Sequence, residues 1–515
     1  MLSSYRSFPK NPVRKNERKS KDFIEKSCCK FFQKCYNFFY LRKQRKASCA
    51  CRKICISSYF YRKETNWRGR RTMNFCDTYA NRTLFCDHWE FYKAPFGAEY
   101  SDDYAFESVD LPHDWLIWDT TNLYETSTGW YRKHFFYRKK EGIRTSIRFD
   151  GVYMDTTVYV NGTVAGEWKY GYSTFQFDLT DLLIDGENKI TVRVNHHAPN
   201  SRWYSGAGIY RNVWLCETPD IHFGNDGIYI STEQKDGRWL TLVTSEVLRP
   251  LGTQTSGILV KQTILDREQT PVATCESEIC AADLSCIPSE VQENGFSYAL
   301  TTQTLPVSAP TLWDVDDPYL YTLVSEIIVE GDVIARVKNN FGFRTIEFTT
   351  DAGFFLNGRH LKLHGSCEHH DNGCLGAVVN KTALRRRFQK LQKMGINAIR
   401  TSHNMPCEEF MELADEMGLL VLSEGFDMWE RPKTDYDYAR FFDEWVSRDV
   451  ASWIRRDRNH PSIIGWSIGN EIFDTHADER GQEVTSLLKR LVRLHDDRAN
   501  GYVTFGSNYM QWENG

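Results

Sequence analysis

The feature that most constrains the fold is a short apolar run at residues 463–468, Ile-Ile-Gly-Trp-Ser-Ile. A nearly continuous run of this kind predicts a strand that is buried on both faces, as in a parallel sheet. Gly469, Asn470 and Glu471 follow directly, so a carboxylate stands where the strand ends. In a (β/α)8 barrel that end of the strands is the catalytic face. Glu471 could therefore be a catalytic acid, or an acid that opens the next helix and complements its dipole.

The segment around this run predicts alternating strands and helices. From Phe341 the hydrophobic period changes from two to helical, which indicates βα units. The expected strands are 361–367, 398–403, 419–424, 463–468 and 502–507, and the expected helices are 381–394, 408–417, 439–456 and 482–494. A closed barrel needs eight strands. We therefore expect the sequence to be the front part of a longer protein.

The preceding residues read as all-β. Runs such as 157–160 and 189–194 alternate apolar and polar residues, and turn dipeptides such as Asn161-Gly162 separate them. Further short strands at 240–243, 257–260 and 321–324 suit an immunoglobulin-like sandwich. We expect this second all-β region to act as a spacer without chemistry of its own.

Charge sets the first 72 residues apart. They hold 21 of the 64 Lys and Arg residues but only 4 of the 68 Asp and Glu residues, and six of the 15 cysteines. A nucleic-acid-binding tail and a zinc module are alternatives, although the cysteine spacing gives no pair of CxxC motifs. The favoured interpretation is a disordered or spurious extension, with the native start at Met73. No apolar core of a secretory signal follows the basic residues.

Several motifs resemble glycoside hydrolase family 2, which includes β-galactosidases and β-glucuronidases. Residues 465–471, Gly-Trp-Ser-Ile-Gly-Asn-Glu, resemble its acid/base strand. Residues 397–403, Asn-Ala-Ile-Arg-Thr-Ser-His, resemble its second barrel strand, and residues 203–211 resemble its sugar-binding jelly roll. The resemblance implies a jelly-roll sugar-binding domain (73–218), an immunoglobulin-like β-sandwich (219–345) and the N-terminal part of a TIM-barrel catalytic domain (346–515). The basic leader (1–72) falls outside the resemblance.

The resemblance also implies a retaining mechanism with two carboxylates about 5–5.5 Å apart. Glu471 matches the acid/base, and its pKa must be high enough to hold a proton for the leaving oxygen. Asn470 matches the residue that binds the sugar 2-hydroxyl. The nucleophile belongs at the end of strand seven, which this chain lacks. Glu513 is a weak substitute, and Glu424 is expected to be structural.

Further residues are expected to contact the sugar by the same resemblance: His369, His370, His403, Asp427, Trp429, Arg202 and Trp203. His370 and His403 would meet galactosyl hydroxyls or developing charge. Trp429 would be a stacking platform, and Arg202 and Trp203 would reach the rim from the jelly roll. A zinc site at His369-His370 is an alternative. Met428 cannot ligate magnesium, so the magnesium site that some β-galactosidases have after strand three is not expected here. The family's catalysis needs no zinc, and neither a metal nor a cofactor is expected.

The predicted function is a retaining exo-β-glycosidase of carbohydrate catabolism that hydrolyses terminal β-D-galactosides. A β-glucuronidase or β-mannosidase of the same family, or an inactive carbohydrate-binding fragment, is the alternative. We expect no turnover from these 515 residues alone. The partner would be a β-linked sugar, with a homo-oligomer as one option and neither nucleic acid nor a membrane as a partner. No stretch reaches the roughly 18–20 apolar residues of a membrane span. The scattered cysteines favour a reducing cytoplasm.

Overall fold

The structure is a computed structural model that describes residues 82–282, 284–498 and 502–507. The expected leader over residues 1–72, the expected native start at Met73 and Glu513 lie outside the described residues. Apart from Asp119–Thr121, the described residues belong to one compact unit, Phe75–Trp118 with Asn122–Gly515. Contacts between the jelly-roll, immunoglobulin-like and βα regions are therefore contacts within one unit.

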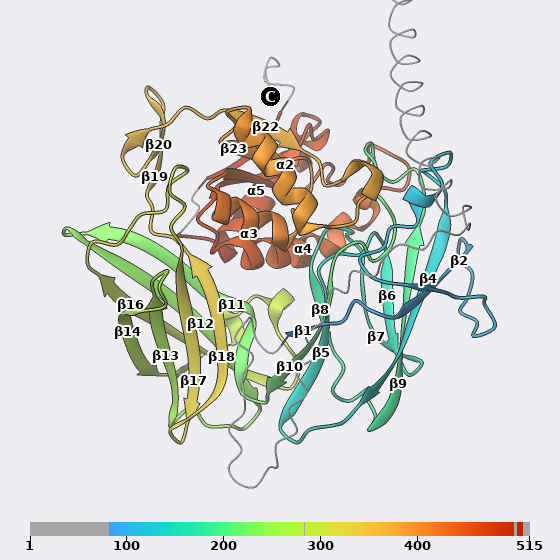
Figure 1. Cartoon of the computed structure of the whole chain (residues 1–515), viewed down its shortest axis with the longest axis horizontal. Helices are drawn as coiled ribbons and strands as arrows, with labels where there is room; N and C mark the ends of the chain where they lie inside the picture. Colours follow the sequence, from blue (N-terminus) through green and yellow to red (C-terminus); the bar gives the residue numbers. More distant parts are fainter. Residues whose placement is uncertain (1–81, 283, 499–501, 508–515) are drawn as a thin grey trace, which may run out of the picture. The chain divides into compact units, whose positions relative to one another are not determined.

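The jelly-roll region consists of two antiparallel sheets (Figure 1, blue to green). One sheet has the order β3 (Glu107–Val109), β2 (Trp89–Pro95), β4 (Ser127–Tyr137), β9 (Gly186–His196), β6 (Thr156–Val160) and β7 (Thr163–Trp168). The other has the order β1 (Arg82–Leu84), β10 (Val213–Pro219), β5 (Ile143–Phe149) and β8 (Phe175–Asp178). Strand β9 buries Ile190, Val192 and Val194 completely, which is the alternation of a strand with one face in a core.

The predicted Asn161-Gly162 turn joins β6 to β7. Both residues have positive φ, 51° and 85°. This is the backbone that a two-residue hairpin needs and that Asn and Gly tolerate best.

The immunoglobulin-like region also has two antiparallel sheets (Figure 1, green to yellow). The first contains β11 (His222–Lys235), β12 (Arg238–Pro250), β16 (Phe296–Val307) and β15 (Cys280–Ala281). The second contains β14 (Pro271–Glu278), β13 (Ile258–Leu265), β17 (Tyr321–Val329) and β18 (Asp332–Phe341). A small sheet of β19 (Ile346–Thr349), β20 (Gly353–Leu356) and β21 (Arg359–His360) follows along the chain.

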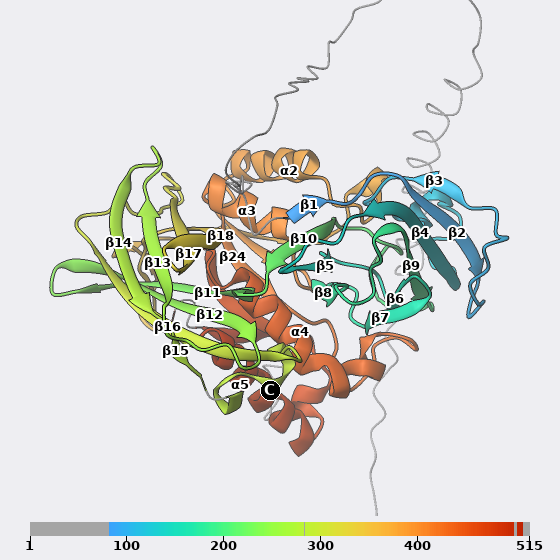
Figure 2. The same cartoon turned by 90° about the horizontal axis from the view of Figure 1, so that it is seen from below.

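The last region is a five-stranded parallel sheet in sequence order. Its strands are β22 (Gly365–Glu368), β23 (Ala398–Thr401), β24 (Leu420–Glu424), β25 (Ile463–Asn470) and β26 (Val503–Gly506). Its helices are α2 (Lys381–Lys393), α3 (Glu408–Met417), α4 (Phe442–Asp457) and α5 (Glu479–His495). Helix α2 lies beside α3, and α4 beside α5 (Figures 1 and 2). The predicted fold class, two β-sandwiches and a partial βα barrel, is confirmed.

Several element boundaries differ from the prediction by a few residues, and two of these differences have local reasons. The first barrel strand begins at Gly365 rather than at residue 361, because the Leu361 N–H is donated to Phe354 and so extends the preceding hairpin. The helix expected from residue 439 starts with a 3-10 turn, η6 (Tyr438–Phe441), whose N-cap Asp437 accepts the Ala439 N–H. The α-helix proper begins at Phe442.

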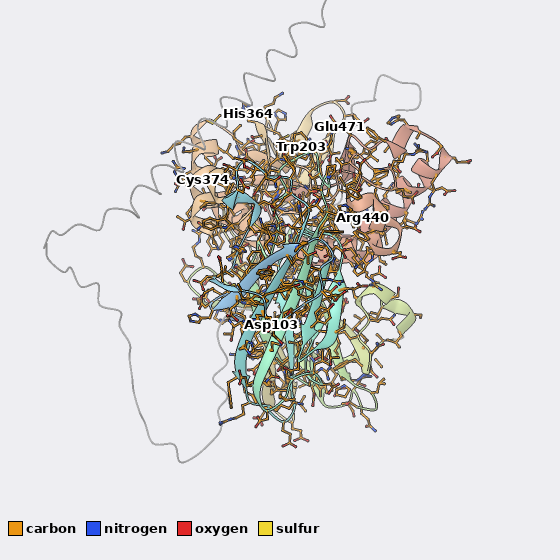
Figure 3. The ribbon with its side chains drawn as sticks, turned by 90° about the vertical axis from the view of Figure 1, so that its right-hand side faces the viewer. Asp103, Trp203, His364, Cys374, Arg440 and Glu471 are labelled. Atoms are coloured by element: carbon orange, nitrogen blue, oxygen red, sulfur yellow. The ribbon has the colours of Figure 1, made fainter. Side chains whose placement is uncertain are left out.

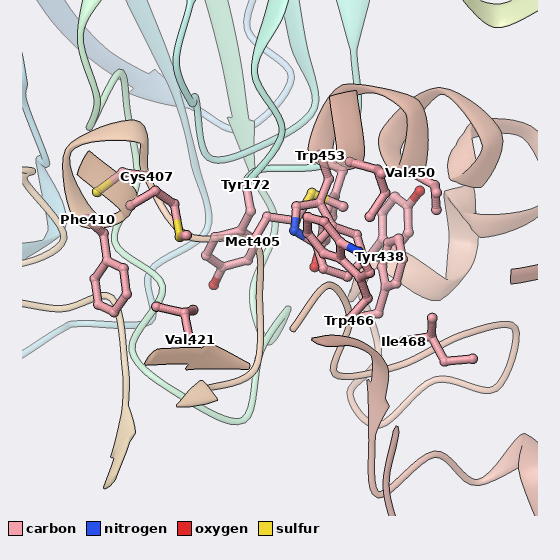
Figure 4. Packing of buried hydrophobic residues seen from close by; sticks show 14 of the residues in the cluster. Tyr172, Met405, Cys407, Phe410, Val421, Tyr438, Val450, Trp453, Trp466 and Ile468 are labelled. Atoms are coloured by element: carbon pink, nitrogen blue, oxygen red, sulfur yellow. The ribbon is translucent and has the colours of Figure 1, made fainter. Parts of the chain in front are cut away.

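The βα region and the jelly roll share one buried cluster. Figure 4 shows part of it, including Tyr172 of the jelly roll together with Met405, Trp453 and Trp466. The rings of Trp453 and Trp466 meet edge to face with centroids 5.2 Å apart. This shared core holds the jelly-roll loops against the carboxyl ends of the parallel strands. Among the helices of the described segments, none has the length and apolar character of a membrane-spanning helix.

Candidate active site

Glu471 lies immediately after β25, at the carboxyl end of the parallel sheet. Its φ is 46°, in the left-handed region that non-glycine residues rarely adopt. Its N–H is donated to the Gly506 carbonyl across 2.6 Å, and its side chain is 41% exposed. Figure 3 shows Glu471 and Trp203 at the same end of the molecule. The carboxyl group is thus open to solvent while its backbone is held.

Asn470 is buried, and both ends of its side-chain amide are engaged. Its Oδ1 accepts a hydrogen bond from Arg400 Nη2 at 2.8 Å, and its Nδ2 donates to Asp427 Oδ1 at 2.8 Å. These two charged partners allow only one orientation of the amide, because an exchange of O and N would place donor against donor. Asn470 therefore presents a defined polar edge beside Glu471.

Asp427 is a buried carboxylate with cations on two sides. Arg202 donates to it from Nη2 at 2.7 Å and from Nε at 3.1 Å, and Lys433 Nζ lies 3.0 Å from Oδ1. Burial by itself would raise the pKa of Asp427, but these cations and the Asn470 amide lower it below its usual range. Asp427 is therefore an anion that organises the site.

Lys433 was not predicted from the sequence. Its side chain is almost fully buried, and burial lowers the pKa of its ammonium group although Asp427 opposes that effect. It follows Arg431 and Pro432 in a polar loop, where a single lysine carries no pattern that distinguishes it from a solvated surface residue. Only the packing reveals its position.

The jelly-roll loop between β9 and β10 brings Arg202 and Trp203 to the site. Arg202 Nη1 donates to Glu471 Oε2 at 3.3 Å. The Trp203 ring is partly exposed, and its centroid lies 4.7 Å from that of His369 and 5.6 Å from that of His403. The exposed aromatic surface of this loop therefore adjoins two of the predicted histidines.

His403 is held by Glu424. The His403 Nδ1 lies 2.7 Å from Glu424 Oε1, and the Glu424 carboxylate, which is completely buried, also accepts from Arg400 and Ser467. A carboxylate bonded to Nδ1 sets the orientation of the imidazole ring. Glu424 thus orients neighbouring side chains.

His369 and His370 differ in their surroundings. Burial, and then the neighbouring His403, lowers the pKa of His369. His370 donates Nε2 to the Ser205 carbonyl at 3.1 Å and packs edge to face on Tyr172, and burial lowers its pKa to about 4. His370 therefore contacts the jelly roll as a neutral ring, whereas His369 adjoins Trp203.

Trp429 is fully buried, in contrast to the stacking role predicted for it. Its Nε1 donates to the Ile468 carbonyl at 2.9 Å, and its ring belongs to the core beneath β25. A ring without an exposed face has no surface on which a sugar can stack. In this structure Trp429 supports the strand that carries Asn470 and Glu471.

The arrangement can support proton transfer at Glu471 beside polar groups that recognise hydroxyls. Asp427 and Glu424, the buried carboxylates described above, are paired with Arg202 and Arg400. Across the described ranges, no three His, Cys, Asp or Glu side chains converge as a metal site would require.

Comparison with protein families matches three models that follow one another along the chain. Residues 99–219 match "Glycosyl hydrolases family 2, sugar binding domain", residues 228–344 match "Glycosyl hydrolases family 2", and residues 348–511 match "Glycosyl hydrolases family 2, TIM barrel domain". The order of the three matches is the order of the three regions of the structure.

Curated relatives and solved structures agree with these matches. A β-galactosidase of Bacteroides ovatus is 42% identical over 396 residues, which are 74% of this chain and 45% of that protein. A β-glucuronidase of Bacteroides fragilis is 28% identical over 74% of this chain and 56% of that protein. The crystal structure of a β-glycosidase from Bacteroides vulgatus superposes with a TM-score of 0.71 at 34% identity, covering 82% of this chain and 54% of that one. The chain spans about half the length of the curated relatives it matches.

Proposed function

Because this chain belongs to glycoside hydrolase family 2, we propose that it carries the acid/base part of a retaining exo-β-glycosidase that cleaves terminal β-D-galactosides. The observation that carries the proposal is the exposed Glu471 carboxyl at the end of β25, next to the clamped amide of Asn470. An acid at this position lies where enzymes with barrels of this kind perform chemistry.

In the proposed reaction, Glu471 first donates its proton to the glycosidic oxygen, and the bond between that oxygen and the anomeric carbon breaks. A second carboxylate attacks the anomeric carbon from the opposite face and forms a glycosyl-enzyme ester. Glu471, now ionised, then takes a proton from water as the water oxygen attacks the anomeric carbon and releases the ester. The sugar leaves with its original configuration, and Glu471 is protonated again.

The second carboxylate is proposed to lie outside the described residues. Asp427 is held by Arg202 and Lys433, and Glu424 by Arg400. A carboxylate that is neutralised in this way is a poor nucleophile, since attack would break its ion pairs. We therefore expect the described residues by themselves to hydrolyse no glycoside.

The charge of the site supports a neutral sugar. Among the described residues, the Arg and Lys side chains that contact Glu424, Asp427, Asn470 or Glu471 are Arg202, Arg400 and Lys433, and each already has a carboxylate partner. A uronate would need a further cation to avoid an unpaired charge. The β-glucuronidase name of the Bacteroides fragilis relative makes a β-glucuronide the second candidate.

The test is hydrolysis of 4-nitrophenyl β-galactoside, β-glucuronide and β-mannoside by the protein that carries this chain. We expect the galactoside to be preferred and Glu471→Gln to lower kcat on the order of 10²–10⁴-fold. Glu479→Gln is the matched control, because Glu479 is exposed at the start of α5. Preference for the glucuronide or mannoside would overturn the substrate assignment. Galactose binding without hydrolysis of any substrate would show a carbohydrate-binding protein instead.

A further inference from the structure

One buried side chain, that of Lys433, contacts a residue before Glu471 and a residue after it. Its Nζ donates to the carbonyl of Asn470, the residue before Glu471, at 2.6 Å. The same ammonium group lies 5.7 Å from the ring centroid of Phe473, two residues after Glu471. The Lys433 side chain is 1% exposed, so it does not reach the solvent-filled space in front of the carboxyl group.

Glu471 needs such support because of its backbone. A glutamate with φ near 46° is in a conformation that persists only where the surrounding structure determines it. The register of β25 with β26 also shifts between Ser467 and Asn470, so the regular ladder does not hold this segment. Two other hydrogen bonds hold this segment instead: Lys433 Nζ donates to the Asn470 carbonyl, and the Glu471 N–H donates to the Gly506 carbonyl.

Lys433 is connected to the Glu471 carboxylate by a second route. Its Nζ pairs with Asp427 Oδ1, Asp427 accepts two hydrogen bonds from Arg202, and Arg202 Nη1 donates to Glu471 Oε2. The buried ammonium thus shares with Arg202 the compensation of the Asp427 charge, while Arg202 Nη1 contacts Glu471. One cation therefore supports both the backbone and the carboxylate of Glu471.

We propose that Lys433 is a positioning residue that aims the Glu471 carboxyl at the leaving-group oxygen. The proposal rests on the acid/base role proposed above, but its geometric part can be tested without turnover. An uncharged side chain of similar length would remove the Lys433 hydrogen bond to the Asn470 carbonyl and would leave Arg202 as the one cation paired with Asp427 among the described residues. The consequence would be a misdirected Glu471 rather than a lost substrate contact.

The variants are Lys433→Met, which keeps the apolar stem, and Lys433→Arg, which keeps the charge. Lys133→Met is the matched control, because Lys133 is also a buried lysine that donates to a backbone carbonyl, that of Asp87, and lies over a phenylalanine ring. Lys133 belongs to β4 of the jelly roll and contacts neither Glu471 nor its partners Asp427 and Arg202.

The first readout is the crystal structure of each variant of the 515-residue chain. In Lys433→Met we expect Glu471 to leave the left-handed conformation and to lose its contact with Arg202, while Lys433→Arg and Lys133→Met keep both. An unchanged Glu471 in Lys433→Met would overturn the proposal, whether or not the protein has activity.

The second readout is kcat/KM of the protein that carries this chain on two galactosides. Methyl β-galactoside needs a proton on its leaving oxygen, whereas 2,4-dinitrophenyl β-galactoside does not. We expect Lys433→Met to lose on the order of 10²-fold on the methyl glycoside and less than about 3-fold on the dinitrophenyl glycoside, with partial recovery in Lys433→Arg. Equal losses on both would show a merely structural role. A wild type that cleaves neither substrate would refute the proposed function and leave the crystallographic result to decide on Lys433.

Discussion

Arg202 and Glu471 are 269 positions apart in sequence, and Arg202 Nη1 lies 3.3 Å from Glu471 Oε2. The remaining nitrogens of the same guanidinium fork onto Asp427. The carboxyl group proposed as acid/base is therefore oriented by a jelly-roll loop as well as by the βα sheet that carries it. Proper docking of the two regions becomes a condition for the chemistry.

Replacement of Arg202 should therefore impair turnover more than folding. We expect Arg202→Met to lower kcat/KM on the order of 10²-fold, because the Glu471 carboxylate loses its orienting donor. Arg202 is partly exposed, so the free energy of unfolding should fall by only about 1 kcal/mol. Kinetics on an aryl β-galactoside and urea unfolding measure the two effects. Full activity of Arg202→Met would contradict the orienting role.

The two tryptophans of the site should behave in opposite ways. Trp203→Ala should weaken sugar binding and leave thermal stability nearly unchanged, because the ring is partly exposed beside His369 and His403. Trp429→Ala should lower the free energy of unfolding by about 3–5 kcal/mol, because it leaves a cavity in the core. Calorimetry of galactose binding and of unfolding distinguishes them. A stable Trp429→Ala protein with weakened binding would restore the stacking role for Trp429.

The pair His460–Asp415 should make stability depend on pH in the alkaline range. Burial alone would lower the pKa of His460, but the Asp415 carboxylate 2.5 Å from Nδ1 raises it to about 9. A raised pKa in the folded state means that the stabilisation is complete below the unfolded value of about 6.5. It is lost as the pH rises towards 9, by at most about 3 kcal/mol.

The measurement for His460 is urea unfolding of wild type and His460→Gln between pH 6 and pH 10. The difference in free energy of unfolding between the two proteins should be largest at pH 6 and should shrink towards pH 10. The other titrating groups are the same in both proteins, so their contributions cancel in this difference. A constant difference across this range would refute the ion pair.

Asp449 of α4 should stabilise the contact between the jelly roll and the βα region, because it accepts hydrogen bonds from both. It accepts hydrogen bonds from Trp168 Nε1 at 2.8 Å, from Ser173 Oγ at 2.6 Å and from the Tyr438 hydroxyl. Asp449→Ala would remove the common acceptor of these three hydrogen bonds, so we expect a loss of about 3 kcal/mol in the free energy of unfolding. Asp449→Asn, which keeps the shape, should lose less. Equal losses in the two variants, measured by denaturant unfolding, would argue against hydrogen bonding as the cause.

The pKa of Asp449 adds a second expectation. Burial raises it to about 7, opposed by the Ser173, Tyr438 and Trp168 donors. Because the folded-state pKa is raised, wild type should lose stability as the pH rises from about 4 to about 7, and Asp449→Asn should lack this slope.

Local patterns in the sequence were sufficient for most elements of the βα region. The apolar run at 463–468 became β25, and the helix expected at residues 408–417 is α3 with these bounds. These predictions succeed because burial on both faces of a strand and one apolar stripe on a helix leave periodic marks in the sequence. The position of Glu471 at a strand end follows from the same periodicity.

What surrounds Glu471 was decided by the tertiary structure. The burial of Trp429, the role of Lys433 and the bridge from Arg202 to Glu471 depend on which loops of separate regions meet at the end of β25. A lone lysine or arginine in a polar loop has the same sequence pattern whether it is solvated or paired in a core. The difference arises only when packing removes water and a distant carboxylate takes its place.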